Sequence, residues 1–587
     1  MQANGLTVPD EPMPKPGTLG FRVQPYGIRT WGELFTPRQM LSLLTFAAAV
    51  RNAQTEIQEV CCDPDRAIGL CSLLAFLPDK VSTRSNILCP WDSQKILTVQ
   101  CFGRQALPML WDFSEANPFG EASGGADEAL HGVTSAVAGC TVSHYPASVS
   151  RGSATSQPWP DASMDAVVTD PPYYDNVPYA DISDFFYVWL KRTLGRLYPE
   201  HFSGQGTPKK QEAVADATRH GGDKQKAVRA YEDMMAESLA EAYRVLKPGG
   251  QLTVVYAHKT TLGWSTLVDA LRRAGFVVTE AWPLDTEGYR LRALNSAALA
   301  SSIFLVARKR EGKATGSHET DVHPELESIV RERVETLWDQ GVTGADLVIA
   351  SVGAGLRAFT RFGRVEYANG EEVPAERFLS EVEAVVLDTI LARLSKEVGG
   401  NGGRYSLAGV DPATRFYILW RYTYRAADLD AGEAIVFANG THVELDGANG
   451  LSSHSRAIVE KKKGKYRLRD FAERGEDENL GLPTEDGQPS PLVDALHRTL
   501  WLMENRPAEL PQFLREAQPN REQMRLVAQA LAGPGLKGGE LADVSASAEQ
   551  AALAKLTANW RSVIEDAVTT TAERADQKRG QQRMFEQ

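Results

Sequence analysis

The amino-acid sequence predicts an α/β fold, with half of a doubly wound parallel sheet between two mainly helical flanking regions. Strand and helix signals alternate between residues 151 and 312, as is typical of a parallel α/β sheet. Outside that region, apolar residues recur mostly at helical spacing. The chain has 587 residues, enough for about two to four domains. We therefore expect three regions: a helical one over 1–150, the sheet over 151–312, and a mixed, mainly helical one over 313–587.

Four apolar runs are predicted to be strands of the sheet: 164–169, 252–256, 276–282 and 302–307. The first run is expected to be a buried strand. Between the strands, two sets of apolar residues share a helical face: Tyr231, Met235, Leu239, Ala242 and Leu246, then Trp264, Leu267, Val268 and Leu271. Lys247-Pro248-Gly249-Gly250 is predicted to end the first of these helices.

The flanking regions carry clear helix signals. A helix is predicted from Pro37 to about Ala53, and Asn117–Gly125 is predicted to be a loop. The polar stretch from His201 to Lys226 has little to bury, so we expect a mobile loop. Further helices are predicted from His323 to a cap at Gly341 and near 378–394, 492–504, 521–531 and 548–567.

Composition excludes several classes of protein. Apolar content of 43% and charged content of 24% are ordinary for a globular protein. The longest apolar stretch, Met40–Val50, is too short to span a bilayer, and no export signal opens the chain. We therefore expect a cytoplasmic protein without a membrane partner. A net charge of −13 argues against purely electrostatic DNA binding but allows a local basic face.

The cysteines do not predict a metal site. All six lie in the first quarter of the chain, and no two form a C-x-x-C pair. A zinc ribbon is therefore unsupported, and we expect no metal ion. Reduced, partly buried thiols explain these residues.

Asp170-Pro171-Pro172-Tyr173 is the most informative motif. It follows the predicted strand 164–169, so it should lie at the carboxyl edge of the sheet, where open α/β folds bind ligands. The Asp170 carboxylate and a carbonyl fixed by the prolines would accept both N–H groups of an exocyclic amine and free its lone pair for methylation. Such acceptors contribute about 1.5–3 kcal/mol each. Tyr173 would stack on the flipped base.

The alternative for the same four residues is a proline turn after a strand. The strand before the motif and the helix and strand after it favour the catalytic interpretation.

A longer stretch carries a family resemblance. The sequences 170–181 and 183–190 resemble the amino-methyltransferase motif of the large DUF1156-type adenine-specific DNA methyltransferases. Residues 32–39, 102–106, 111–119 and 244–250 are similar to other stretches of that family. The resemblance implies a Rossmann-like methyltransferase sheet and S-adenosylmethionine-dependent methyl transfer to adenine N6 in DNA, often in phage defence or restriction-modification.

The family also implies a cofactor loop of the form Asp-Pro-Phe-x-Gly-x-Gly, in a part that precedes the stretches matched here. We therefore expect a second polypeptide to carry that loop and complete the sheet, unless the loop was lost by truncation. Two internal substitutes stay open: Asn117–Gly120 with Gly124-Gly125, and a strand-like run, Ala345–Ala350, before Gly353-Ala354-Gly355. A lone G-x-G is weak evidence, and loop or helix-packing glycines explain both.

Phe35-Thr36-Pro37-Arg38 resembles the motif that contacts the cofactor in many adenine methyltransferases. The resemblance thus implies that Phe35, Thr36, Pro37 and Asp170 bind S-adenosylmethionine. A helix start with Thr36 as N-cap and Pro37 in the first turn explains the same residues, and the two roles can coincide.

Two basic segments could contact DNA. Lys461–Arg469 is the densest basic run, although a solvated loop or edge strand is the commoner explanation and is slightly favoured. Lys209 and Lys210 form the second candidate. His258 after the strand 252–256 is expected to be a polar strand-end residue, because the transfer needs no strong base.

Three hypotheses remain open from the sequence. The first is a DNA adenine-N6 methyltransferase that acts with a partner. The second is methyl transfer to another amino group, such as that of cytosine N4, of guanine in RNA or of a protein glutamine. The third is a non-catalytic chain that binds DNA or a subunit.

Overall fold

The computed structural model describes most of the chain. The described residues are 6–102, 105–120, 123–140, 147–172, 177–256, 261–284, 302–312, 315–342, 344–399, 406–447, 450–452, 457–462, 464–484, 487–533 and 548–566. They form two compact units: Met1–Pro158 with Pro172–Ser238, and Trp159–Pro171 with Leu239–Gln587. The division does not follow the three predicted regions, because the chain leaves the second unit between Pro171 and Pro172 and returns to it within helix α5 (Lys224–Val245).

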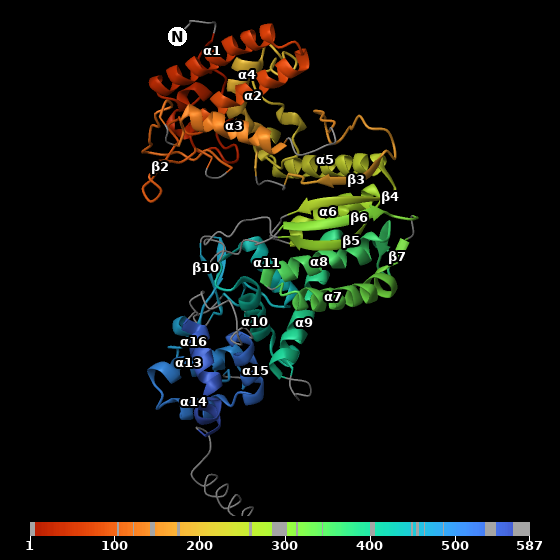
Figure 1. Cartoon of the computed structure of the whole chain (residues 1–587). Helices are drawn as coiled ribbons and strands as arrows, with labels where there is room; N and C mark the ends of the chain where they lie inside the picture. Colours follow the sequence, from red (N-terminus) through yellow and green to blue (C-terminus); the bar gives the residue numbers. More distant parts are fainter. Residues whose placement is uncertain are drawn as a thin grey trace, which may run out of the picture. The chain divides into compact units, whose positions relative to one another are not determined.

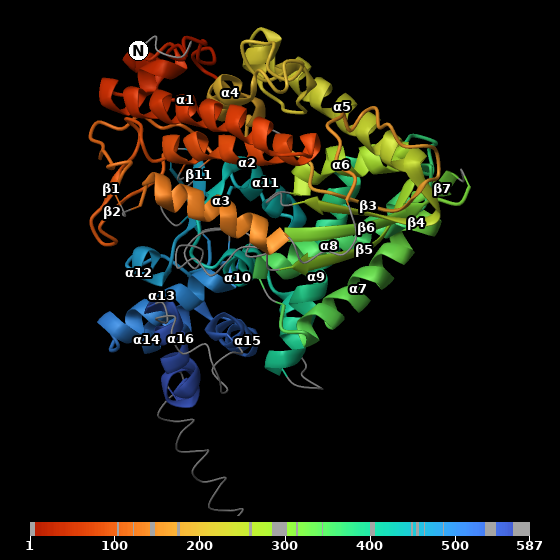
Figure 2. The ribbon, with the colours of Figure 1, turned by 45° about the horizontal axis from the view of Figure 1, so that its top comes forward.

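The first unit is helical, as predicted. Its main elements are α1 (Pro37–Val60), α2 (Pro64–Ser82), α3 (Ala126–Cys140), α4 (Tyr179–Leu194) and the short hairpin β1 (Trp91–Asp92) and β2 (Leu97–Thr98). Helix α2 contacts α1, α3 and α4. Figure 2 shows α1, α2 and α3 side by side. The core between them is rich in aromatic rings, such as Trp31, Phe185 and Trp189, which are almost fully buried. The predicted helix from Pro37 is confirmed and runs beyond Ala53.

The polar stretch 201–226 is not the mobile loop that we expected. It contains η3 (Lys209–Gln211) and η4 (Ala217–His220), and it is fixed to α4 by ion pairs. Lys209 Nζ lies 2.5 Å from Asp184, and Arg219 lies 2.5 Å from Asp181. Much of its order comes from ion pairs with little exposure to water, which hydrophobic periodicity does not register.

The second unit is built on a small mixed sheet with the strand order β3-β4-β6-β5 (Figure 1). The strands are β3 (Met164–Thr169), β4 (Leu246–Tyr256), β5 (Phe276–Leu284) and β6 (Ser302–Lys309). All four predicted strands are confirmed, but the expected fully parallel sheet is wrong. Strand β3 is parallel to β4, whereas β6 is antiparallel to both β4 and β5. Strands β5 and β6 are successive strands of the sheet that pair with each other antiparallel, whereas a parallel pair needs a long crossover connection.

Strand β3 is an exposed edge strand rather than the buried strand that its composition predicts. Val168 is 70% exposed, and Asp165 and Ala166 are also exposed. By contrast, Phe276, Val278 and Ala281 are fully buried in β5 at the opposite end of the sheet. The apolar run Met164–Thr169 therefore pairs on one side only, with β4, among the described residues.

Helices make up the rest of the second unit. They are α6 (Thr261–Ala274), α7 (His323–Asp339), α8 (Gly344–Thr360), α9 (Ala375–Gly399), α10 (Pro412–Tyr424), α11 (Ala431–Gly440), α12 (Phe471–Arg474), α13 (Leu492–Asn505), α14 (Leu510–Ala517), α15 (Arg521–Ala532) and α16 (Ala548–Ala558). Short strands join them: β7 (Thr315–Ser317) with β8 (Arg364–Glu366), and β9 (Leu429–Asp430), β10 (Val459–Lys462) and β11 (Lys465–Leu468). The helices predicted from periodicity are confirmed, including the end at Gly341, whose φ is +79°.

The strand-like run Ala345–Ala350 belongs to helix α8, which packs against both β5 and β6. A Cβ atom on Gly353 would lie 2.7 Å from Ala281 of β5. A Cβ atom on Gly355 would lie 2.7 Å from Val382 of α9. The two glycines thus allow the helix to approach the sheet on one side and a neighbouring helix on the other, which is the helix-packing interpretation.

This close packing predicts that Gly353→Val destabilises the second unit by about 1–3 kcal/mol, because the new side chain must displace strand β5. Urea unfolding followed by circular dichroism measures the loss. Arg357→Val is the matched control, since it places the same β-branched residue on the exposed side of α8. Equal effects of the two substitutions would contradict the packing argument.

Candidate active site

The Asp170 motif lies at the carboxyl edge of the sheet, as predicted. Thr169, the last residue of β3, pairs in parallel with Val254 of β4. Because β5 runs in the same direction as these strands, Asp170, Tyr256 and Leu284 all lie at one edge. The Asp170 side chain is exposed there and already takes part in an interaction.

A buried tyrosine fixes the second proline of the motif. The Tyr231 hydroxyl of α5 donates a hydrogen bond of 2.9 Å to the carbonyl oxygen of Pro172. Tyr231 is 1% exposed, so its ring is held by the core of the protein. Within the described part of the chain, the Pro171 carbonyl receives no such bond, which leaves it as the acceptor beside Asp170.

Sequence reasoning assigned Tyr231 to a helix core and missed this contact. The available signal was a tyrosine hydroxyl on the otherwise apolar face of helix α5. Tyr173 and His258 lie outside the described residues, so their predicted roles remain predictions.

Phe35, Thr36 and Pro37 lie in the first unit and start helix α1. Thr36 is its N-cap: the Thr36 hydroxyl oxygen accepts a hydrogen bond from the Gln39 amide at 3.3 Å, and the hydroxyl donates to Glu115 at 2.7 Å. Pro37 occupies the first turn. The helix-capping interpretation is confirmed for these residues.

Phe35 itself belongs to the aromatic core. Its ring is 5.4 Å from that of Trp189 and 6.1 Å from that of Phe185, both on α4. The structure thus brings Phe35 against the helix that follows the Asp170 motif in sequence. A side chain packed in this way supports α4.

Neither internal glycine candidate forms a loop after a strand. Gly353 and Gly355 lie inside α8. Gly120 belongs to a turn closed on Asn117, and the Pro118 carbonyl accepts a bond from Ala126 at the start of α3. Neither candidate, where the structure describes it, therefore has the form of the cofactor loop that the family resemblance implies.

The basic run 461–469 forms the hairpin β10–β11, and acidic neighbours neutralise much of it. Lys461 lies 2.6 Å from Asp446, and Arg467 lies 2.5 Å from Glu460. The hydrogen bond from Lys461 lowers the pKa of Asp446 to about 2. The edge-strand interpretation holds for Lys461 and Lys462 of β10, whereas β11 is the central strand between β10 and β9. Lys209 is likewise engaged by Asp184.

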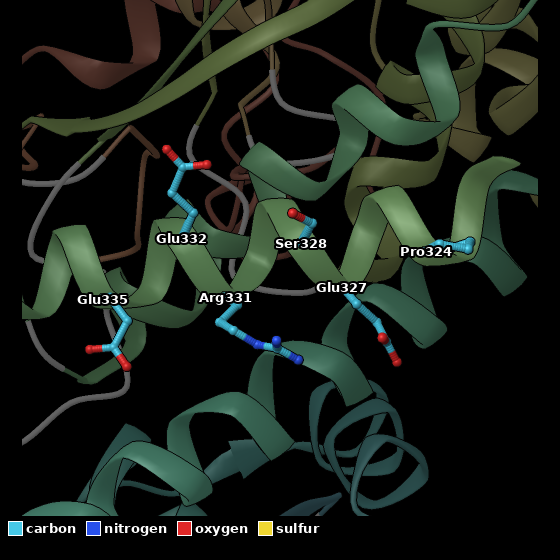
Figure 3. A pocket seen from close by; sticks show the side chains of 6 residues that line it. All are labelled: Pro324, Glu327, Ser328, Arg331, Glu332 and Glu335. Atoms are coloured by element: carbon cyan, nitrogen blue, oxygen red, sulfur yellow. The ribbon is translucent and has the colours of Figure 1, made fainter.

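One cavity of the second unit has no features of a site. Its volume is about 380 Å³, and Figure 3 shows that all six lining side chains come from the exposed side of α7. Its acidic residues, among them Glu327 and Glu332, point into solvent rather than toward a common centre. No cluster of three or more His, Cys, Asp or Glu residues among those described is arranged to hold a metal ion.

Two global observations complete the description. Within the described residues, no helix combines the length and apolar character needed to cross a bilayer. Comparisons with protein-family models, with curated proteins and with solved structures found no match to this chain.

Proposed function

We propose that this chain supplies the acceptor-binding part of an S-adenosylmethionine-dependent methyltransferase that modifies N6 of adenine in DNA. The observation that carries the proposal is the position of Asp170-Pro171-Pro172 directly after β3, at the carboxyl edge of the sheet. Open α/β sheets bind their ligands at this edge. The resemblance to DUF1156-type methyltransferases adds DNA as the substrate and a cytoplasmic role in phage defence.

The chain's own residues account for the handling of the target amine. Adenine N6 is conjugated with its ring and is a poor nucleophile. The Asp170 carboxylate and the Pro171 carbonyl accept its two N–H bonds, which draws the nitrogen toward tetrahedral geometry. The prolines restrict the backbone and Tyr231 anchors Pro172, so these acceptors are oriented before the base arrives. The methyl group itself comes from S-adenosylmethionine.

We assign the glycine-rich cofactor loop to a second polypeptide, because neither internal glycine candidate forms a loop after a strand in the described residues. The exposed edge of β3 supports this assignment. Val168 is 70% exposed on a strand that pairs, among the described residues, with β4 alone. A further parallel strand would cover such an edge and satisfy its backbone groups. A strand added there would bring its own carboxyl end beside Asp170, where a glycine-rich loop is needed.

The test is to express the chain with the polypeptide encoded beside it in a host that lacks adenine methylation. Digested host DNA is then analysed for N6-methyladenine by mass spectrometry. We expect the wild type to methylate adenine and Asp170→Ala to lower the rate by about 10²–10³-fold, as for loss of one preorganised electrostatic contact. Asp165→Ala is the matched control, because Asp165 is an exposed carboxylate of the same strand outside the motif.

Two results would overturn the proposal. One is the absence of methylated bases with the wild type, and the other is methylation that Asp170→Ala leaves unchanged. Val168→Lys tests the partner separately. It should abolish methylation in the mixture without unfolding the chain, since an exposed position tolerates lysine.

A further inference from the structure

The first unit contains a cavity that the proposed methyl transfer does not use. Its volume is about 500 Å³, within the range of small-molecule sites. Helices α2, α3 and α4 contribute to its lining, and α2 contacts both of the others. The cavity lies wholly within one unit, so it does not depend on how the two units are arranged.

Asp79 of α2 is a buried carboxyl group that faces this cavity. Its side chain is 6% exposed, and its Oδ1 atom has no hydrogen-bond partner among the described residues. Burial raises the pKa of Asp79 well above its usual range. A neutral carboxyl group offers one O–H donor and one acceptor side by side. Buried polar atoms without partners are rare, so this atom requires an explanation.

The protonation of Asp79 can be checked without a ligand. The unfolded carboxyl ionises near pH 3.8, whereas the folded one keeps its proton to a higher pH. Between these values the native state binds more protons, so stability falls as pH rises. Asp79→Asn removes this loss of stability at high pH. The melting temperature of the first unfolding transition should therefore rise by at least about 2 °C at pH 8, and by less at pH 4.5. An equal shift at both pH values would show that Asp79 is ionised when buried.

A second unpartnered atom lines the same cavity. The Nε atom of Arg84 is buried without a hydrogen-bond partner among the described residues. Its other end binds Glu128, with Nη1 3.2 Å from both carboxylate oxygens. The Gly124 amide, together with the charges of Arg84 and Lys80, lowers the pKa of Glu128, which therefore stays ionised. The positive charges of Lys80 and Arg84 and the negative charge of Glu128 together leave one net positive charge at the cavity.

Aromatic side chains provide the apolar part of the wall. Phe76 of α2 is 45% exposed although it lines the cavity, and Phe186 of α4 is half-buried. Exposed aromatic faces of this kind stack on planar rings, with about 1–3 kcal/mol per base in single-stranded nucleic acid complexes. A planar ring, a donor–acceptor pair and a net positive charge thus occur together in one cavity.

We propose that this cavity binds a nucleoside monophosphate unit. The base stacks on Phe76 and Phe186 and presents a donor and an acceptor to the Asp79 carboxyl group, while the phosphate binds Lys80 and Arg84. The unit is either a free nucleotide or one residue of a single-stranded DNA. The proposal does not rest on methyl transfer, because it involves binding alone and residues of the first unit.

Isothermal titration of the full chain with adenosine 5′-monophosphate tests the site. We expect saturable binding at one site, at least tenfold weaker binding of adenosine, and a loss of at least tenfold with Asp79→Leu. Asp79→Asn should bind as the wild type does, because an amide also offers a donor and an acceptor. Asp65→Asn, an exposed acid of the same helix, should leave binding unchanged.

A second titration uses a short oligodeoxyadenylate. The probe that binds more tightly, the mononucleotide or the oligonucleotide, shows whether the site takes a free nucleotide or a residue of a DNA strand. Circular dichroism establishes that each variant is folded. The proposal fails if neither probe binds saturably, in which case water satisfies Asp79 and Arg84. It also fails if folded Asp79→Leu binds both probes as well as the wild type does.

Discussion

Replacing Glu549 with alanine is expected to destabilise the C-terminal helices by about 3–5 kcal/mol, the loss typical of removing one partner from a buried ion pair. Glu549 begins α16 and is 5% exposed. The Tyr417 hydroxyl donates a hydrogen bond to it, and Arg421 Nε lies 3.0 Å away. His497 Nε2 lies 3.2 Å from the same carboxylate. Removal leaves these three polar groups buried without their shared acceptor.

The charges in this network favour an ionised carboxylate. Burial acts to raise the pKa of Glu549, but the close approach of His497 and the charge of Arg421 outweigh burial and hold the pKa below its usual value. Its contribution is therefore present above the pKa of the unfolded carboxyl group and is lost as the pH falls through the lower folded value. Glu549→Gln should retain part of the hydrogen bonding and lose less stability than Glu549→Ala.

Hydrogen exchange resolved by mass spectrometry measures this loss in α13, which packs on both α10 and α16. A change of about 3–5 kcal/mol corresponds to roughly 10²–10⁴-fold faster exchange. Lys555→Ala is the matched control, because Lys555 lies on the exposed side of α16. Unchanged protection in Glu549→Ala would mean that the network does not hold α16 in place.

Asp184→Ala is expected to detach the segment 206–219 from α4, with a local loss of about 2–4 kcal/mol. Asp184 accepts hydrogen bonds from the Thr207 amide at 2.7 Å and from Lys209 at 2.5 Å. The effect is smaller than for a fully buried pair, because the Lys209 side chain remains 29% exposed to water. Gly206 also packs against this carboxylate, since a Cβ atom there would lie 2.8 Å from Asp184.

Limited trypsin digestion detects the opening at Lys209, Lys210 and Arg219. Cleavage should become about 30- to 1,000-fold faster in Asp184→Ala, because proteolysis follows the population of the open form. Ser183→Ala changes the exposed neighbour of Asp184 and serves as the control. If the wild type is cleaved as fast as Asp184→Ala, Asp184 does not hold the segment 206–219 against α4.

Periodic apolar patterns predicted much of the fold. Helix α7 buries one side, and buried residues alternate with partly exposed ones along β4 and β6. Pattern reasoning was wrong for β3, since an apolar run does not reveal whether neighbours cover it. For α8 the sequence left two interpretations open, because small residues such as Gly353 and Gly355 serve both turns and close helix packing.

For the candidate site, sequence alone placed Asp170 at the strand end and predicted the cap at Thr36. It did not predict the Tyr231–Pro172 hydrogen bond, the ion pairs of Asp181 and Asp184, or the burial of Asp79. Each of these depends on a partner distant in sequence, and no local pattern encodes such a distance. Polar residues in these pairs resemble ordinary surface residues until the fold brings them together.

The path of the chain between the units has a consequence for how the protein folds during synthesis. Strand β3 emerges from the ribosome before the segment 172–238 of the other unit, yet Met164 pairs with Leu246, about 80 residues later. The sheet thus cannot begin to close until most of the first unit has been translated, and domains made in this order tend to fold as they emerge. Asp170 acquires its final surroundings late, after both units have formed.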